Sequence, residues 1–238
     1  MKSEIRRIKE LTDHVDGWLH DTEGELLYRL AKGRQGKGVI VEIGSWKGKS
    51  TIWLARGSQE GKKIKVYAID PHTGSAEHKE SLGTTSTFRE FQSNIQTARV
   101  EDIVVPLVKT SEEASRNFPA PVEFVFIDGA HEYDFVKLDF EVWSPRIIQG
   151  GIIAFHDTIG WPGPKQVVKE FIVSSNSFRN VRFVHSIVYA QKVAKNSTFD
   201  RLRNRYVLLL LSLYQLLSWR WLPKVVQITM IRTFSIIQ

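Results

Sequence analysis

Hydrophobic residues along the chain change from helical spacing to short continuous runs and back. Residues 1–36 carry apolar positions at mixed helical spacing: Val15, Trp18, Leu19, Leu26, Leu27 and Leu30. Gly33 and Gly36 then break the pattern. Short apolar runs then predict strands over 38–43, 65–69, 103–107, 122–127 and 151–155, with one or two more inside 181–191. The intervening segments predict helices over 49–56, 85–98, 111–117, 133–143 and 165–174.

The order of these elements predicts the fold class. Strand and helix alternate repeatedly, which favours an α/β fold: a Rossmann-like, doubly wound, mainly parallel seven-stranded sheet with helices on both faces. The strand over 38–43 is apolar almost throughout, as expected of a strand buried on both faces. We therefore divide the chain into an N-terminal helical segment (1–36), an α/β domain (37–195) and a basic, apolar helical tail (196–238).

The absence of cysteine from the 238 residues removes several classes of site. It excludes a disulfide scaffold, a cysteine-based zinc site and a thiol nucleophile. The first ten residues are rich in charge and lack the apolar core of a secretory signal, so we expect none. Both features favour a cytoplasmic protein.

The net charge of +7 is unevenly distributed. Six basic residues and one acid follow Phe199, so most of the excess lies in the tail. An apolar run over 206–222 breaks at Arg220 and Pro223, which argues against a membrane span of about 20 apolar residues. Basic and apolar residues together favour peripheral contact with anionic lipid, or a homo-oligomer contact, through residues 200–238. Packing of the tail on the chain's own core is the alternative.

A glycine loop follows the first predicted strand and opens a helix, with the sequence Glu-Ile-Gly-Ser-Trp-Lys-Gly-Lys-Ser-Thr at 42–51. Glycine allows a tight turn and close approach of a ligand, and a helix start offers free amides. A phosphate-binding P-loop needs four residues between its glycines, whereas three separate Gly44 from Gly48. A P-loop nucleotide phosphotransferase and an ordinary strand-to-helix turn stay as alternatives.

Acids and histidines follow the later strands. Asp70 ends the strand over 65–69 and follows Gly48 by 22 residues, a separation that suits binding of ribose hydroxyls. An aspartate before a proline is also common in turns. Asp128 ends the strand over 122–127, and His156 and Asp157 follow the strand over 151–155. Since ligands bind beyond the carboxyl ends of parallel strands, these positions predict one common site.

Three motifs resemble those of a known family. The loop pattern Glu-x-Gly-x-x-x-Gly-x-Ser is similar to motif I of class I S-adenosylmethionine (SAM)-dependent methyltransferases. Ile-Asp-Gly-Ala-His-Glu-Tyr at 127–133 and Gly-Gly-Ile-Ile-Ala-Phe-His-Asp at 150–157 resemble the branch of sugar and macrolide O-methyltransferases and catechol O-methyltransferase-like enzymes. The resemblance covers residues 38–160. It implies a SAM site made by Glu42, Gly44, Ser45, Gly48, Ser50, Thr51, Asp70, Ser111 and Asp128.

The acids and histidines suit methyl transfer to a hydroxyl, because an alcohol is a poor nucleophile until it is deprotonated or bound to a metal. Asp128 and Asp157 offer oxygen ligands for Mg²⁺. Asp128, His131 and His156 are the predicted catalytic residues, with either histidine as the base. Related enzymes have a further acid near the second motif, where this chain has Thr158, so a metal requirement stays open. In the alternative without a catalytic role, Asp128 belongs to an ordinary turn and His131 caps the following helix.

Two other segments are expected to border the site. Ser111 follows the third strand, which lies near adenine in the resembling enzymes, and it would also cap the helix over 111–117. His72 and Thr73 would border the substrate pocket, and residues 71–87 would form a lid over it.

These patterns predict a SAM-dependent O-methyltransferase that acts on a small hydroxylated acceptor, preferably a sugar or glycan, with or without help from Mg²⁺. The alternatives are a P-loop-like phosphotransferase and a catalytically idle SAM-fold module for binding or assembly. No nucleic acid partner is expected. If the tail meets a bilayer, the chain would act at the inner face of the membrane on a lipid-linked glycan.

Overall fold

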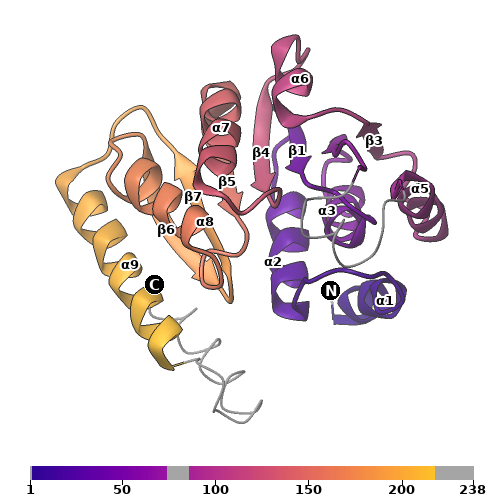
Figure 1. Cartoon of the computed structure of the whole chain (residues 1–238), viewed down its shortest axis with the longest axis horizontal. Coiled ribbons are helices and arrows are strands. Elements are labelled where there is room, and N and C mark those ends of the chain that lie inside the picture. The colour runs from indigo at the N-terminus through magenta and orange to yellow at the C-terminus, as the bar shows by residue number, and fades with distance from the viewer. Residues whose placement is uncertain (1, 74–85, 218–238) are drawn as a thin grey trace.

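The chain folds around one seven-stranded sheet (Figure 1). A computed structural model describes residues 2–73 and 86–217. The strands are β1 (Val39–Ile43), β2 (Val66–Ile69), β3 (Val104–Leu107), β4 (Val122–Ile127), β5 (Ile147–Phe155), β6 (Phe178–Val184) and β7 (Ile187–Lys192). Their order is β3-β2-β1-β4-β5-β7-β6. The first five run parallel, and β7 pairs antiparallel with both β5 and β6, which confirms the predicted fold class.

Alternate residues of the parallel strands face two separate cores. Val125 and Ile127 of β4 join the core under α6 (Ser111–Arg116), α7 (Tyr133–Trp143), α8 (Pro162–Val167) and α9 (Thr198–Leu217). Phe124 and Phe126 join the other core, under α1 (Lys2–Thr12), α2 (Asp21–Lys32), α3 (Lys49–Gln59) and α5 (Phe88–Thr97). Helices thus cover both faces of the sheet, as Figure 1 shows.

The order of the strands determines where a ligand can enter. Strands β2 and β3 lie on one side of β1, and β4 and β5 lie on the other. Connections leave β1 and β4 in opposite directions, so a crevice is expected at their carboxyl ends. Gly44 follows β1, Asp128 follows β4 and His156 follows β5, so all three lie at this crevice.

Two of the element boundaries that differ from the predicted ones have a local cause. Strand β5 begins at Ile147 rather than at position 151. It includes Gly150, whose φ is 82°, and glycines hide a strand from the hydrophobic pattern. The last helix of the domain begins at Pro162, because proline suits a first helical turn, and continues as a π-helix over Val168–Val173.

The predicted cap of α6 is wrong by one residue. Thr110, not Ser111, is the N-cap: its hydroxyl accepts a hydrogen bond from the Glu113 amide. The Glu113 carboxylate accepts one from the Thr110 amide in return. This reciprocal pair is a capping box, which satisfies two amides at once and so outcompetes a serine one position later.

Helix α9 packs part of the predicted tail on the domain. Val207, Leu210, Leu211 and Tyr214 are buried in the α7–α9 core. Asn204 is fully buried, and its amide donates to the carbonyl oxygen of Phe178. Among the helices of residues 2–73 and 86–217, none is long and apolar enough to cross a bilayer. Residues 218–238 of the predicted tail lie outside the described residues.

Helices α2 and α3 approach each other closely because two glycines lie between them. A Cβ on Gly24 would collide with the indole ring of Trp53. A Cβ on Gly57 would collide with the carbonyl oxygen of Tyr28. The N-terminal helices are therefore packed directly on the first helix of the α/β domain.

We predict that Gly57→Ala destabilises the protein. Alanine favours a helix over glycine by about 1 kcal/mol. The collision with α2 costs more than this gain, so we expect a net loss of about 1–3 kcal/mol in the free energy of unfolding. Urea denaturation measures it. Gly160→Ala is the control, since no heavy atom lies within 4 Å of its added Cβ. Equal midpoints for the two variants would contradict the close α2–α3 packing.

Candidate active site

A cavity of about 650 Å³ opens at the carboxyl ends of β1, β4 and β5. This volume is within the range of sites for drug-sized ligands. Four segments and two single residues provide most of its lining: 16–19, 44–47, 128–132, 156–157, Phe135 and Trp161. The cavity therefore joins the glycine loop to the acids and histidines that follow β4 and β5.

The glycine loop has the backbone geometry that its glycines predict. Gly44 has a φ of 85°, and a Cβ there would collide with the carbonyl oxygen of Asp128. Gly48 has a φ of 89° and is the N-cap of α3. Side chains rarely adopt such positive φ values, so glycine is required at both positions. Ser45 and Ser50 line the cavity beside them.

Glu42 lies behind this loop rather than among the residues that line the cavity. Its carboxylate accepts a hydrogen bond from the hydroxyl of Thr51, the third residue of α3. Its other oxygen, Oε1, is buried without a hydrogen-bond partner among the described residues. Burial raises the pKa of Glu42 to about 8, although hydrogen bonds from Ser50 and Thr51 oppose the shift. The contacts of Glu42 and Thr51 tie β1 to the start of α3.

Asp70 supports the loop from the neighbouring strand. Its Oδ2 accepts a hydrogen bond of 2.8 Å from the amide of Trp46, and its Oδ1 accepts one of 2.6 Å from the amide of His72. His72 itself is buried outside the cavity, where it packs on Phe88 and Phe91. His72 therefore does not border the cavity as predicted. Most of the predicted lid, residues 74–85, lies outside the described residues.

Ser111 lies away from the cavity. Its hydroxyl oxygen accepts a hydrogen bond of 2.9 Å from the indole nitrogen of Trp143. Burial raises the pKa of the nearby Asp139 to about 6, and a hydrogen bond with Ser111 opposes that shift. Ser111 thus belongs to a buried polar group between α6 and α7.

Two acids and two histidines form the floor cluster: Asp128, His131, His156 and Asp157. The Nδ1 atom of His156 lies 3.0 Å from Asp128 Oδ1 and 3.0 Å from Asp157 Oδ2. The Nε2 atom of His131 also lies 3.0 Å from Asp157 Oδ2. His156 is almost fully buried, whereas His131 is partly exposed to the cavity. The sequence predicted all four residues, and the structure brings them together.

The close charges shift the pKa values of the cluster in opposite directions. Burial lowers the pKa of His156, but Asp128, Asp157 and Glu23 outweigh it and hold that pKa well above its ordinary value. Burial raises the pKa of Asp128, and His156 opposes the shift. Burial also acts to raise the pKa of Asp157, yet the His131 and His156 imidazoles beside it hold that pKa below the ordinary value. The cluster thus favours an ionised Asp157 beside a protonated His156.

Glu23 of α2 is a site residue that the sequence gave no reason to select. Its Oε2 atom accepts a hydrogen bond of 3.3 Å from His156 Nε2, across 133 positions of sequence. Strand alternation explains the meeting, because Ile152 and Ala154 face the core that contains α2 and His156 is the next residue on that side. Glu23 also forms a capping box with His20 at the start of α2.

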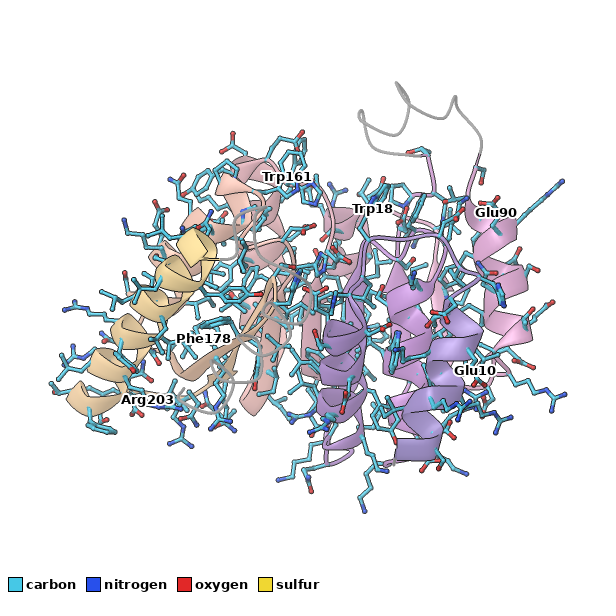
Figure 2. All side chains as sticks on the ribbon, turned by 90° about the horizontal axis from the view of Figure 1, so that it is seen from below. Glu10, Trp18, Glu90, Trp161, Phe178 and Arg203 are labelled. Atoms are coloured by element: carbon cyan, nitrogen blue, oxygen red, sulfur yellow. The ribbon has the colours of Figure 1, made fainter. Side chains whose placement is uncertain are left out.

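Aromatic residues surround the cavity. Trp18 stacks on Trp46 with ring centroids 5.1 Å apart, and His131 stacks on Trp161 at 4.5 Å. Figure 2 shows Trp18 and Trp161 at the same edge of the molecule. Phe135 is also exposed there. An acceptor would therefore meet flat apolar walls above a charged floor.

The floor cluster fits a divalent cation. Asp128, His156 and Asp157 each offer one ligand atom, and these atoms lie within 4.8 Å of one another. Two carboxylate oxygens and one imidazole nitrogen suit Mg²⁺ or Mn²⁺. Thr158, the residue after Asp157, donates its hydroxyl to the carbonyl oxygen of Ser186. Thr158 therefore supports the β6–β7 turn.

Comparison with known proteins agrees with this geometry. A family profile described as a methyltransferase domain matches residues 41–158, which include the glycine loop and the floor cluster. Residues 41–158 therefore belong to this methyltransferase domain family, and the fold is shared with SAM-dependent O-methyltransferases. This assignment favours SAM over a nucleoside triphosphate as the ligand of the glycine loop.

Individual relatives of this methyltransferase match over different lengths. An uncharacterised protein of Sinorhizobium fredii is 30% identical over 149 residues, covering 61% of this chain and 16% of that protein. A catechol O-methyltransferase of Niastella koreensis is 28% identical over 139 residues, covering 58% of this chain and 56% of that enzyme. The chain thus spans less than two thirds of either relative. The O-methyltransferase TomG of Streptomyces achromogenes, solved in complex with SAM, superposes with a TM-score of 0.57 at 20% identity, covering 81% and 89% of the two chains.

We predict that Glu42→Gln changes how the stability of the methyltransferase depends on pH. The pKa of Glu42 is about 8 in the folded chain against 4.5 ordinarily, so the folded chain binds the extra proton between these values. Wild-type stability therefore falls as the pH rises through this window, and the glutamine variant lacks that loss. From pH 6 to pH 8, Glu42→Gln should gain about 2 kcal/mol relative to wild type.

Urea denaturation of the ligand-free protein at several pH values measures this difference. Glu101→Gln, at an exposed position, is the control and should follow wild type. Parallel curves for wild type and Glu42→Gln would show that the Glu42 carboxyl is not held protonated by burial.

Proposed function

We propose that this chain transfers the methyl group of SAM to a hydroxyl oxygen of a small acceptor, with a sugar ring as the preferred class. One observation carries the proposal: Gly44 and Ser45 line the same cavity as Asp128, His131 and Asp157. A donor bound on the glycine loop and a hydroxyl bound on the floor cluster would share one enclosure. Such proximity is the main requirement of an in-line transfer.

The described loop has polar groups that suit SAM. Ser45 Oγ is buried without a partner among the described residues, and a bound ligand would satisfy it. Gly44 keeps the loop free of a side chain beside Asp128. Each oxygen of Asp70 accepts one amide, which leaves lone pairs for ribose hydroxyls. Ser111 would lie on the side of the bound adenine, because α6 follows the carboxyl end of β3 at the same edge of the sheet.

Asp128, Asp157 and His156 would hold the cation. Mg²⁺ or Mn²⁺, when bound there, would polarise the acceptor hydroxyl and lower its pKa. The floor cluster would otherwise bring two carboxylates together at low solvent exposure, which is costly without a compensating positive charge. In the absence of a metal, the His156 ring supplies that charge.

His131 is the better candidate for the general base. It lines the cavity and is partly exposed, whereas His156 is buried between carboxylates. A proton leaving the acceptor hydroxyl would pass to His131 as the new oxygen–carbon bond forms and the carbon–sulfur bond breaks. Asp157, 3.0 Å from His131 Nε2, would stabilise the resulting imidazolium.

The walls of the cavity favour a ring-shaped acceptor. The Trp18–Trp46 pair and Trp161 offer apolar faces on which the C–H face of a sugar can lie. The nearby carboxylates and Lys47 and Lys49 supply polar contacts for hydroxyl groups. A catechol ring would fit the same walls, so both acceptor classes belong in the first assay.

We predict that Asp128→Asn lowers methyl transfer at least about 100-fold, because it removes a ligand of the cation and a charge from the cluster. The assay follows S-adenosylhomocysteine formed from SAM with a panel of simple glycosides and catechol, in Mg²⁺ and in EDTA. Asp134→Asn, an exposed acid in the first turn of α7, is the control. Retained turnover in Asp128→Asn would remove the floor cluster from the mechanism. Binding of SAM without turnover of any acceptor would favour the idle-module alternative.

The exposed face of α9 is an apolar surface to which another molecule could bind. Six large apolar residues there alternate in spacing between three and four: Phe199, Leu202, Tyr206, Leu209, Leu213 and Leu216. We call them the α9 stripe. They are between 42% and 74% exposed. This spacing is that of the seam between two packed helices.

We propose that a second copy of the chain covers the α9 stripe in antiparallel orientation. Arg201, Arg203 and Arg205 all lie in the first half of α9, and residues 206–217 carry no charge. Parallel pairing would bring the two arginine sets together. Antiparallel pairing would instead lay each set beside the uncharged half and negative dipole end of the other helix. A peripheral membrane contact, with the chain at the inner face, is the competing outcome.

We predict that Leu209→Lys with Leu213→Lys converts a dimer into a monomer in sedimentation equilibrium at micromolar concentration. With the stripes in antiparallel register, positions 209 and 213 lie opposite Tyr206 and Leu202 of the second copy, beside its arginines. The two lysines would therefore lose apolar contact and repel those arginines. Val108→Lys, an exposed apolar position away from α9, should leave the dimer intact. A wild-type monomer would overturn the dimer. Flotation of that monomer with phosphatidylglycerol vesicles, lost in the double variant, would assign the stripe to a membrane.

A further inference from the structure

We infer that Glu23 is a positioning residue of the active site, which orients the His156 ring so that Nδ1 faces the metal ligands Asp128 and Asp157. The inference rests on the proposed cation site and adds a residue that lies outside the region matched by the methyltransferase profile. Glu23 comes from α2, in the N-terminal segment, and is 1% exposed.

The contacts of Glu23 are unusual for a residue in the first turn of a helix. Its Oε1 atom accepts hydrogen bonds from the Ser186 amide at 2.9 Å, the Ser186 hydroxyl at 2.6 Å and His185 Nδ1 at 3.0 Å. Its Oε2 atom accepts from the His20 amide at 2.8 Å and from His156 Nε2 at 3.3 Å. Donors from three separate parts of the chain thus hold one buried carboxylate.

This network fixes the direction of the His156 ring. With Nε2 bonded to Glu23, Nδ1 lies 3.0 Å from a carboxylate oxygen of Asp128 and 3.0 Å from one of Asp157. Nδ1 is aligned as a hydrogen bond to neither carboxylate. A flipped ring would place carbon atoms towards both Glu23 and the acids, and would lose every one of these contacts. The orientation therefore depends on Glu23.

The same arrangement is what a metal-binding histidine requires. Such a histidine donates its second ring N–H to a carboxylate or carbonyl, which holds the ring and the tautomer, and loss of that partner weakens metal binding about 10–100-fold. Here the second nitrogen is Nε2 and the carboxylate is Glu23. A purely structural role, in which Glu23 only ties α2 to the β6–β7 turn through Ser186, predicts no effect at Nδ1.

Glu23→Gln tests the inference, because glutamine keeps the size and one acceptor oxygen but loses the second. Ser186→Ala is the matched control: it removes a different donor to the same carboxylate and leaves the His156 contact. We expect Glu23→Gln to weaken Mn²⁺ binding about 10–100-fold, measured by the free-ion signal in electron paramagnetic resonance. SAM affinity, measured by calorimetry, should stay within about twofold of wild type, and Ser186→Ala should bind Mn²⁺ within about twofold of wild type.

Three results separate the possibilities. Mn²⁺ binding that is unchanged in Glu23→Gln overturns the inference, and so does an equal loss in Ser186→Ala. Parallel loss of SAM and Mn²⁺ binding in Glu23→Gln indicates general disruption and also overturns it.

A readout on the wild-type protein needs no variant and no bound metal. Proton–nitrogen spectra of histidine-labelled protein should show a downfield His156 Nε2–H resonance, as expected of a donor to a carboxylate. If wild type binds no Mn²⁺, the cation site of the proposed function fails, and this resonance still decides the orienting role of Glu23. A wild-type spectrum without the Nε2–H resonance overturns the inference.

Discussion

The buried imidazole of His156 is the contact on which the active site depends. A charged or polar ring at this depth is stable only if both of its nitrogens have partners. Asp128 and Asp157 meet one nitrogen and Glu23 meets the other. Asp128 follows β4, Asp157 follows β5 and Glu23 belongs to α2. The His156 ring therefore joins the carboxyl ends of two strands to the N-terminal helical segment.

Close backbone approach is the second constraint, and it explains why the cavity can hold two ligands. Gly44 lets the loop after β1 lie against the carbonyl oxygen of Asp128, and Gly57 lets α2 lie against α3. The first approach brings the glycine loop to the floor cluster. The second brings Glu23 to within reach of His156. Side chains at either glycine would separate parts of the site that must act together.

The sequence was sufficient for the features that strand ends determine. Apolar runs predicted the parallel strands, and the residues after them, Gly44, Asp70, Asp128 and His156, lie where the topology requires. It was not sufficient for contacts between distant elements. An acid in the first turn of a helix needs no functional explanation, and only the packing of α2 on the sheet brings Glu23 to His156. The pattern also could not divide α9 into its buried face and its exposed stripe, because both faces are apolar.

The departure from related enzymes after Asp157 now has a physical interpretation. Thr158, where the resemblance leads us to expect a further acid nearby, supports the turn that carries His185 and Ser186, two of the donors to Glu23. A carboxylate there would enter a region already rich in negative charge. His156 supplies the third potential ligand atom instead, with Glu23 behind it. Calorimetry of the purified protein with S-adenosylhomocysteine and with Mg²⁺–ATP tests the central claim most directly. The account predicts one S-adenosylhomocysteine site per chain and no ATP binding, and saturable ATP binding without S-adenosylhomocysteine binding would contradict it.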